Sequence, residues 1–215
     1  MDNVKLDNII PLGSIIRTKH PKSEWISNVV YKVFDNYIQI ELTQDHINNF
    51  ILVGDEVKCK CFGQEAEILL DAAVDSIDIG KTRLLTLVIN KMNMFQNIRN
   101  YHRYDTYIVS RITIGRNVQV FCIVTSISSS GISVLSKSDF PLASEVYAEV
   151  FIDSGNILRF SGEIVRKVVT ENGFEFGIKF SEIDKEDTEI LDCILEELKA
   201  KDNSLIKKYL SSINS

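Results

Sequence analysis

The sequence of 215 residues has no apolar run near the roughly 20 residues that a membrane-spanning helix needs. Its first seven residues lack the basic segment followed by an apolar run that marks a secretory signal. Basic residues are not in excess, because the net charge is −6, and the chain therefore has no overall electrostatic footprint for DNA or RNA. From these absences we expect a cytoplasmic protein with no membrane span and no nucleic-acid partner. Any anion site has to be a local basic cluster.

Residues that commonly carry catalysis are also scarce. The three histidines are His20, His46 and His102, and none of them lies in a nucleophile-elbow, zinc or phosphate-loop context. We interpret Asp45-His46 as part of a surface loop. The ten glycines form no loop that could cradle a nucleoside triphosphate. The sequence thus predicts no catalytic residue and no cofactor, and the chain is expected not to be an enzyme.

The four cysteines are Cys59, Cys61, Cys122 and Cys193. Cys59 and Cys61 flank Lys60 in an alternating run, so their side chains should point to one face of a strand. No further ligands follow at zinc-finger spacing. We therefore expect buried or half-buried thiols and no metal site.

In the first half of the chain, apolar and polar residues alternate over short runs, which is typical of β-strands. Two β-rich runs around the pair Asp35-Asn36 indicate a hairpin, and the segment Val53–Val57 looks like a turn that enters a strand. Only Gln44–Phe50 could form a short helical turn before residue 90. The expected strands are Asn28–Phe34, Tyr37–Leu42, Val57–Phe62, Glu67–Ala73 and Arg83–Ile89.

The second half contains six more short strands, and this spacing suggests a closed barrel or a sandwich. A helix over Asp184–Leu198 follows, with acidic residues in its first turn, where Asp184 or Asp187 can cap it. Its apolar stripe packs against the barrel or forms a dimer seam, and we favour packing. The last segment, Ser204–Ile213, is either a second short helix or a frayed tail. The expected strands are Thr106–Ile114, Asn117–Ser126, Ile132–Ser136, Val146–Ile152, Leu158–Val169 and Phe174–Phe180.

Between the halves, residues 90–107 are polar, aromatic and locally basic without a clear period, which indicates a connector. The sequence thus predicts an all-β fold with a C-terminal helix, built from two small β-barrels. The domain limits are 1–92 for the first barrel, 93–106 for the connector, and 107–215 for the second, six-stranded barrel with its helix.

Arg99 and Arg103 lie four residues apart in this connector. A guanidinium group binds phosphate through two parallel hydrogen bonds and pairs with guanine at O6 and N7. Tyr101 and His102 add surfaces on which a base could stack. The set favours a purine-phosphate ligand, although two arginines in a linker are also commonly solvated or paired with carboxylates.

A second cluster, Ser126–Gly131, ends a predicted strand. Its hydroxyl and backbone N–H groups could read a base edge from a barrel rim, and Gly131 could take a positive φ or let a ligand approach closely. An ordinary serine-rich turn is the alternative.

Together the two clusters resemble the PilZ domain, whose pattern is R-x-x-x-R followed by D/N-x-S-x-x-G. The resemblance covers about residues 97–200 and includes Gly162–Arg166, Phe176–Phe180 and the following helix. It implies binding of cyclic di-GMP by Arg99 and Arg103, with Ser128 bonding a guanine or phosphate and Gly131 keeping the rim loop close. Ser126 departs from the pattern, and losing one good polar pair to a base costs about 1–3 kcal/mol.

The β-rich first half joined to such a connector resembles the flagellar-brake subfamily, and Val53–Val57 is similar to an element of its N-terminal barrels. This resemblance implies a bacterial protein that relays cyclic di-GMP to a protein partner, such as flagellar motor components. The alternative is a degenerate PilZ-like scaffold that does not bind the nucleotide. Position 126 is the feature that separates the two.

Overall fold

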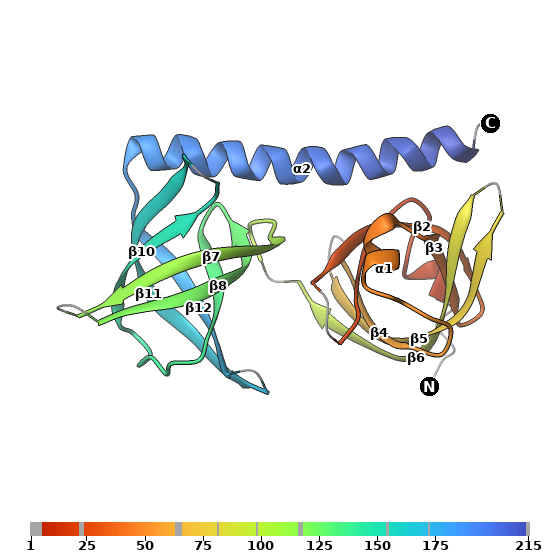
Figure 1. The fold of residues 1–215 in the computed structure, drawn as a ribbon, viewed down its shortest axis with the longest axis horizontal. Coiled ribbons are helices and arrows are strands. Elements are labelled where there is room, and N and C mark those ends of the chain that lie inside the picture. The colour runs from red at the N-terminus through yellow and green to blue at the C-terminus, as the bar shows by residue number, and fades with distance from the viewer. Residues whose placement is uncertain are drawn as a thin grey trace. The chain divides into compact units, whose positions relative to one another are not determined.

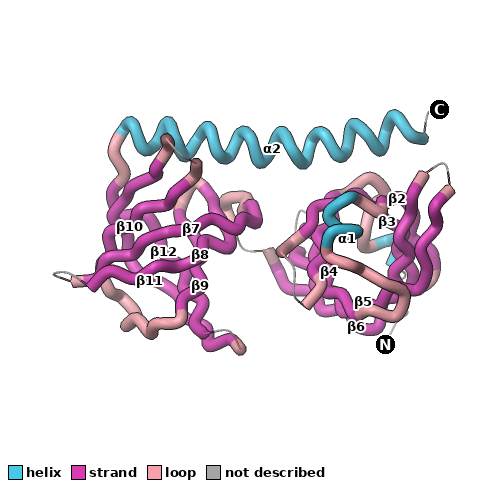
Figure 2. Tube along the Cα trace, in the orientation of Figure 1, coloured by secondary structure: helices cyan, strands magenta, loops and turns pink. Residues whose placement is uncertain are grey.

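The computed structural model describes residues 6–21, 24–62, 66–80, 82–97, 99–115, 118–153, 155–171 and 173–213. The predicted turns at 115–117, 153–156 and 171–173 therefore lie partly outside the described residues. The contacts divide the chain into two compact units, one of residues 1–98 with 200–215 and one of residues 99–199. Each unit holds one closed barrel, as Figures 1 and 2 show.

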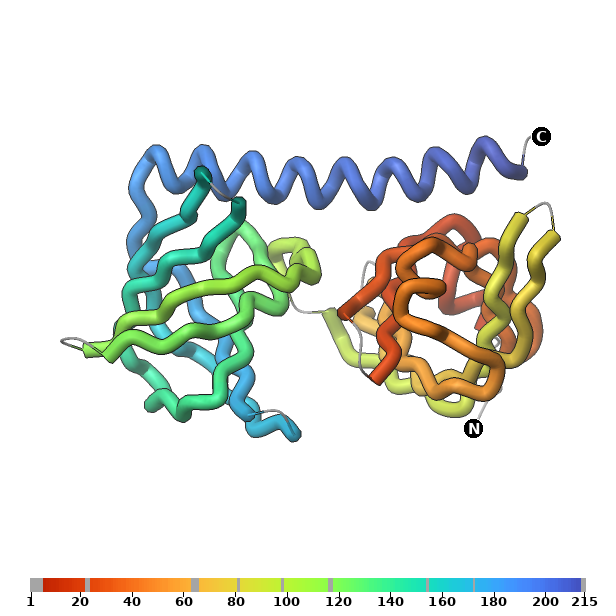
Figure 3. The backbone as a smooth tube through the Cα atoms, viewed as in Figure 1, coloured from red at the N-terminus to blue at the C-terminus, as the bar shows by residue number. Residues whose placement is uncertain are grey.

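The first barrel closes in the strand order β1-β2-β3-β6-β5-β4. A short 3₁₀ helix, η1 (Leu6–Asn8), precedes it, and α1 (Gln44–Asn48) follows β3. The trace in Figure 3 follows the long hairpin of β5 and β6. The strands are β1 (Ile15–Lys19), β2 (Ile26–Phe34), β3 (Tyr37–Glu41), β4 (Glu56–Phe62), β5 (Ala66–Ile79) and β6 (Arg83–Gln96).

The predicted hairpin at Asp35-Asn36 is confirmed, since β2 and β3 pair up to Phe34 and Tyr37 and Asp35 has a φ of 50°. Strand β1 was not predicted. The expectation of a connector without regular structure over residues 90–107 is wrong at both ends, because β6 continues to Gln96 and the next strand begins at Tyr104. Main-chain pairing with β5 holds this polar part of β6 in the sheet.

The core of the first barrel is made of alternate strand residues. Cys59 and Cys61 share the buried face as predicted, and burial raises the pKa of the Cys61 thiol to about 12. His46 contradicts its assignment to a surface loop, because it is fully buried. Its Nε2 lies 3.0 Å from Thr18 Oγ1, and its Nδ1 accepts a hydrogen bond from the backbone N–H of Thr43 at 3.2 Å. This histidine has a structural role that ties α1 to β1.

The second barrel closes in the order β10-β11-β12-β9-β8-β7, so the expected six-stranded barrel is confirmed. Each predicted strand is present with its ends moved by a few residues. The strands are β7 (Tyr104–Ile114), β8 (Val118–Ser128), β9 (Gly131–Ser136), β10 (Glu145–Phe151), β11 (Ile157–Thr170) and β12 (Gly173–Glu182).

The helix α2 (Lys185–Ile213) packs its first half against this barrel, as the apolar stripe predicted. Leu191 and Ile194 are buried in the barrel's core cluster. Asp187, expected as a possible cap, instead accepts a hydrogen bond from the backbone N–H of Arg159 at 2.7 Å, which fastens the helix to β11.

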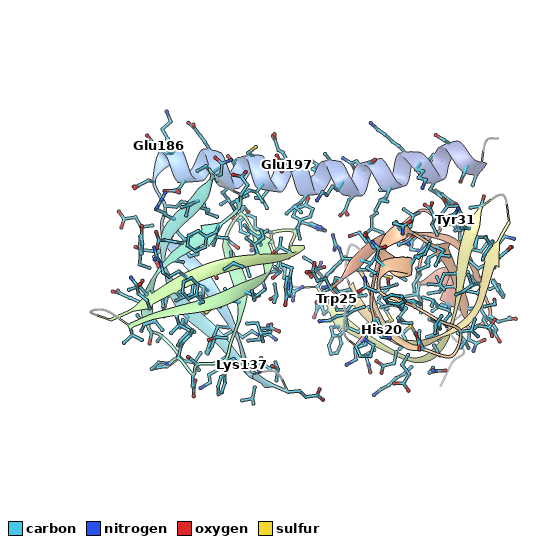
Figure 4. All side chains as sticks on the ribbon, viewed as in Figure 1. His20, Trp25, Tyr31, Lys137, Glu186 and Glu197 are labelled. Carbon is cyan, nitrogen blue, oxygen red and sulfur yellow. The ribbon has the colours of Figure 1, made fainter. Side chains whose placement is uncertain are left out.

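The last part of α2 differs from the expected short helix or frayed tail, because α2 is one continuous helix to Ile213. Residues 200–215 group with the first barrel, whereas the sequence placed them with the second. Asp202 forms an ion pair of 3.0 Å with Arg17, and the ring of Tyr209 meets that of Tyr31 edge-on at 5.1 Å. Tyr31 is labelled in Figure 4. A Cβ on Gly13, whose φ is 77°, would lie 2.9 Å from the Tyr209 ring.

No helix in the described part of the chain is long and apolar enough to cross a membrane.

Candidate functional site

The arginine-bearing segment leads directly into β7 of the second barrel. Arg99 is exposed and Arg103 is half-buried immediately before the first strand residue, Tyr104. The ring of His102 packs against that of Tyr104 with the centroids 4.5 Å apart. Arg103 is thus held beside the barrel wall by the start of the strand.

The register of β7 and β8 brings the two motifs together. Tyr104 pairs with Ile127, which lies between Ser126 and Ser128, so Arg103 comes next to the end of β8 that carries both serines. Arg103 and the serine-glycine turn therefore lie at the same end of the second barrel. This proximity was inferred from the sequence only through a family pattern, and strand pairing now gives its physical cause.

Ser128 is buried, and its hydroxyl closes the turn between β8 and β9. Its Oγ donates a hydrogen bond to the carbonyl oxygen of Gly131 at 3.0 Å and accepts one from the backbone N–H of Ser130 at 3.4 Å. In this conformation the side chain orders the rim loop.

Gly131 is required by the sheet. A Cβ at this position would lie 2.2 Å from the carbonyl oxygen of Ile178 on β12. Its φ is not in the positive range, so the expectation of a possible left-handed conformation is not met. The close approach that it permits is between two strands of the barrel, and this keeps the rim loop tight against β12.

Ser126 is half-buried on the outer face of β8, where the β7–β8–β9 register sets it between Asp105 and Ser133. The same row continues through Gly177 on β12 to Arg166 on β11. The row thus has small residues between the acidic Asp105 and the basic Arg166, and the two central ones, Ser133 and Gly177, are buried. No described residue hydrogen-bonds to the Ser126 hydroxyl.

Sequence reasoning missed Asp105. It follows Arg103 by two residues, but only the strand pairing reveals that it lies opposite Ser126. A carboxylate is therefore present at the edge where the D/N-x-S-x-x-G pattern has its acid or amide, although it comes from the neighbouring strand.

A cleft of about 440 Å³ opens beside the two motifs. Residues of the arginine segment, of the β8–β9 turn and of α2 form its walls: His102, Tyr104, Ser129, Asp192, Leu195, Glu196 and Lys199. The volume falls within the range of small-ligand pockets.

The family model described as "PilZ domain" matches residues 97–197. Residues 97–197 form a PilZ domain. The match spans both motifs, all six strands of the second barrel and the first half of α2. The resemblance inferred from Arg99, Arg103, Ser128 and Gly131 is thereby confirmed.

Solved structures similar to the whole chain share little sequence with it. The inhibitor of motility MotI/DgrA of Bacillus subtilis is 17% identical, with 88% of this chain and 99% of that chain covered and a TM-score of 0.41. YcgR of Escherichia coli, solved in complex with cyclic di-GMP, is 12% identical, with coverages of 91% and 88% and a TM-score of 0.48. The MrkH–cyclic di-GMP complex of K. pneumonia is 12% identical, with 89% of both chains covered and a TM-score of 0.47. No curated protein matches the sequence.

Proposed function

We propose that this PilZ domain binds cyclic di-GMP and that the chain relays binding to a protein partner, as a cytoplasmic regulator of flagellar motility or a related surface process. The observation that supports this most is the register of β7 and β8, because it brings the end of the arginine segment and the serine-glycine turn to the same end of the barrel. Each part alone has an ordinary structural explanation, whereas their convergence at one end of the barrel brings arginine charge beside hydroxyl groups, which suits a compact anion.

The ligand chemistry follows from the side chains. Arg99 and Arg103 carry the positive charge that the phosphates require, and a guanidinium pairs bidentately with guanine O6 and N7. Asp105 and Ser126 offer oxygens that can accept from guanine N1–H and N2–H. The backbone of the Ser128–Gly131 turn supplies N–H groups at the rim. These are binding roles, and the proposal assigns no catalytic step to any residue.

A second candidate function is a PilZ-like scaffold that has lost the nucleotide. Two observations favour it: serine replaces the acid or amide at position 126, and the Ser128 hydroxyl is engaged within its own turn. In that case the barrel would act only as an interaction module.

A calorimetric titration of the full chain with cyclic di-GMP and, separately, cyclic di-AMP distinguishes the two functions. We expect binding of cyclic di-GMP with clear discrimination against cyclic di-AMP, since the arginine fork complements guanine O6 and N7 but not the adenine N6 amino group. Equal affinity for both nucleotides would contradict guanine recognition. No binding of either at high micromolar concentration would favour the scaffold.

A further inference from the structure

Residues 47–55, which comprise the end of α1 and the segment that joins it to β4 in the first barrel, are called the α1–β4 loop; they include several exposed large apolar side chains. Ile47 is 41% exposed, Phe50 83%, Leu52 63% and Val53 60%. Single exposed apolar residues are common on protein surfaces. Here four lie within seven residues, and exposed apolar side chains that gather in this way mark interaction sites.

Phe50 is also strained. Its φ is 52°, in the left-handed region that bulky residues avoid. The backbone N–H groups of Phe50 and Ile51 donate to the carbonyl oxygens of Ile47 and His46, so Phe50 is the left-handed residue that ends α1, a position that glycine usually takes. Here the strain places an aromatic ring in solvent, where it gains no packing within the barrel. The folded chain alone therefore gives no reason for a phenylalanine at this position.

The base of the loop is rigid although its tip is exposed. Ile51 is buried, and its backbone N–H donates to the carbonyl oxygen of His46 at 3.2 Å. His46 is itself tied to Thr18. The N–H of Gly54 donates to the carbonyl oxygen of Val74 on β5 at 2.8 Å. An apolar tip on an ordered base loses little conformational entropy when it binds, which favours a preformed docking element.

Acidic residues flank the apolar tip on both sides in the sequence and form its acidic border. Asp45 and Glu56 are exposed, and the half-buried Asp55 accepts a hydrogen bond from the N–H of Leu52 at 2.8 Å. Loops and helices that enter membranes carry Lys or Arg beside their apolar residues, because the lipid surface is negative. This border has the opposite charge. It complements a basic protein surface and opposes docking on anionic lipid.

We propose that the α1–β4 loop is the docking element for a partner protein, with Phe50 inserted in an apolar pocket of that partner and the acidic border facing lysines or arginines around the pocket. The proposal rests on the proposed relay to a protein partner and adds the surface and the chemistry of the contact. It involves the first barrel only and does not depend on the nucleotide site.

The first test introduces the photoreactive residue p-benzoylphenylalanine at position 50 of the full chain, in the cells that naturally express it. The matched control carries it at Phe121, which is 69% exposed on β8. We expect position 50, and not position 121, to cross-link to one protein at an apolar site bordered by Lys or Arg. Adducts with a second copy of this chain, with lipid, or with the same proteins at both positions would overturn the proposal, and so would no adduct.

The second test uses Phe50→Asn with the purified cross-linked partner. Asparagine tolerates a positive φ, so the variant should melt at the same temperature as wild type or higher. Its affinity for the partner should fall by about 30-fold, as for a hot-spot residue. A lower melting temperature, or unchanged affinity, would show a merely structural residue and overturn the proposal.

Nucleotide binding keeps the two proposals separable. Phe50→Asn should bind cyclic di-GMP like wild type. If wild type does not bind the nucleotide but cross-links as expected, the ligand assignment fails and the docking element stands. If it binds the nucleotide but gives no specific adduct at position 50, the docking element fails alone.

Discussion

Asp105 on β7 lies directly opposite Ser126 on β8. Like charges at directly opposed sheet positions are destabilising. An aspartate at position 126, as in the usual PilZ pattern, would face the carboxylate of Asp105. Serine avoids that repulsion and leaves one carboxylate at this edge. The departure at position 126 is therefore compatible with guanine recognition, because the neighbouring strand supplies an acceptor.

This arrangement predicts different results for two substitutions at position 126. Ser126→Asn should tighten binding of cyclic di-GMP by about fivefold, the equivalent of about 1 kcal/mol, since its amide oxygen adds an acceptor without charge. Ser126→Asp should gain less and should lower the melting temperature, because it opposes Asp105. Titrations in matched salt, with thermal melts, check both. If Asp tightened binding more than Asn at unchanged stability, the opposed pair would not matter.

Gly131 should be intolerant of any side chain. Gly131→Ala sets a Cβ 2.2 Å from the carbonyl oxygen of Ile178, and strands β9 and β12 would have to separate. We expect a loss of about 1–3 kcal/mol in the free energy of unfolding, the usual cost of overpacking. Urea unfolding measures it. Gly155→Ala is the control, because its nearest contact would be 3.8 Å from the Asp153 side chain. Equal effects of the two substitutions would contradict the close strand contact.

His46 should make stability depend on pH. Burial lowers its pKa to about 4, and the charge of Asp45 opposes this only in part. Because the folded-state pKa lies below that of the unfolded chain, the stabilisation is complete above pH 6.5 and is lost as the pH falls toward 4. The loss should be on the order of 3 kcal/mol. Urea unfolding of wild type and His46→Gln across this range measures it, and parallel curves for the two proteins would exclude the buried histidine as the cause.

The end of α2 should stabilise the first barrel. Tyr209 is buried against Tyr31 and Gly13, so Tyr209→Ala should lower the free energy of unfolding by about 3 kcal/mol. Leu210→Ala is the control at an adjacent, exposed position. Chemical unfolding followed by the fluorescence of Trp25, which lies in the same unit, reports on this barrel. If both variants were equally stable, residues 200–213 would not be part of its fold.

The sequence predicted the elements that are determined by the pattern of residues within their own segment. Strand β10 and the first half of β11 alternate between buried and more exposed residues, and the turns of the second barrel contain Gly, Asn, Asp and Ser, so the limits of its strands were nearly correct. Strand β1 was missed because two of its five residues, Arg17 and Thr18, are polar although they are buried, so the sequence of this strand has no alternating apolar pattern. The end of β6 was missed because its polar residues are held by pairing with β5.

The rest depends on partners distant in the sequence. Tyr209 lies in the segment predicted as a second short helix or a frayed tail, and Asp202 comes just before that segment; their contacts with Tyr31 and Arg17 tie this part of α2 to the first barrel. Arg99, Arg103 and Ser128 could be selected as site residues because the family pattern carries them. Asp105 has no such signal, since its relation to Ser126 exists only in the paired sheet.

The central claim, that the arginine segment and the serine-glycine turn form a cyclic di-GMP site, is tested most directly by titrating wild type, Arg99→Ala and Arg103→Ala side by side in matched salt. Each arginine should contribute a charge-assisted contact of about 1.5–3 kcal/mol, so each variant should bind cyclic di-GMP at least about tenfold more weakly with an unchanged melting temperature. Arg159→Ala, on the same barrel and paired with Glu149, should bind like wild type. Wild-type affinity in either connector variant, or a loss equal to that of Arg159→Ala, would contradict the account.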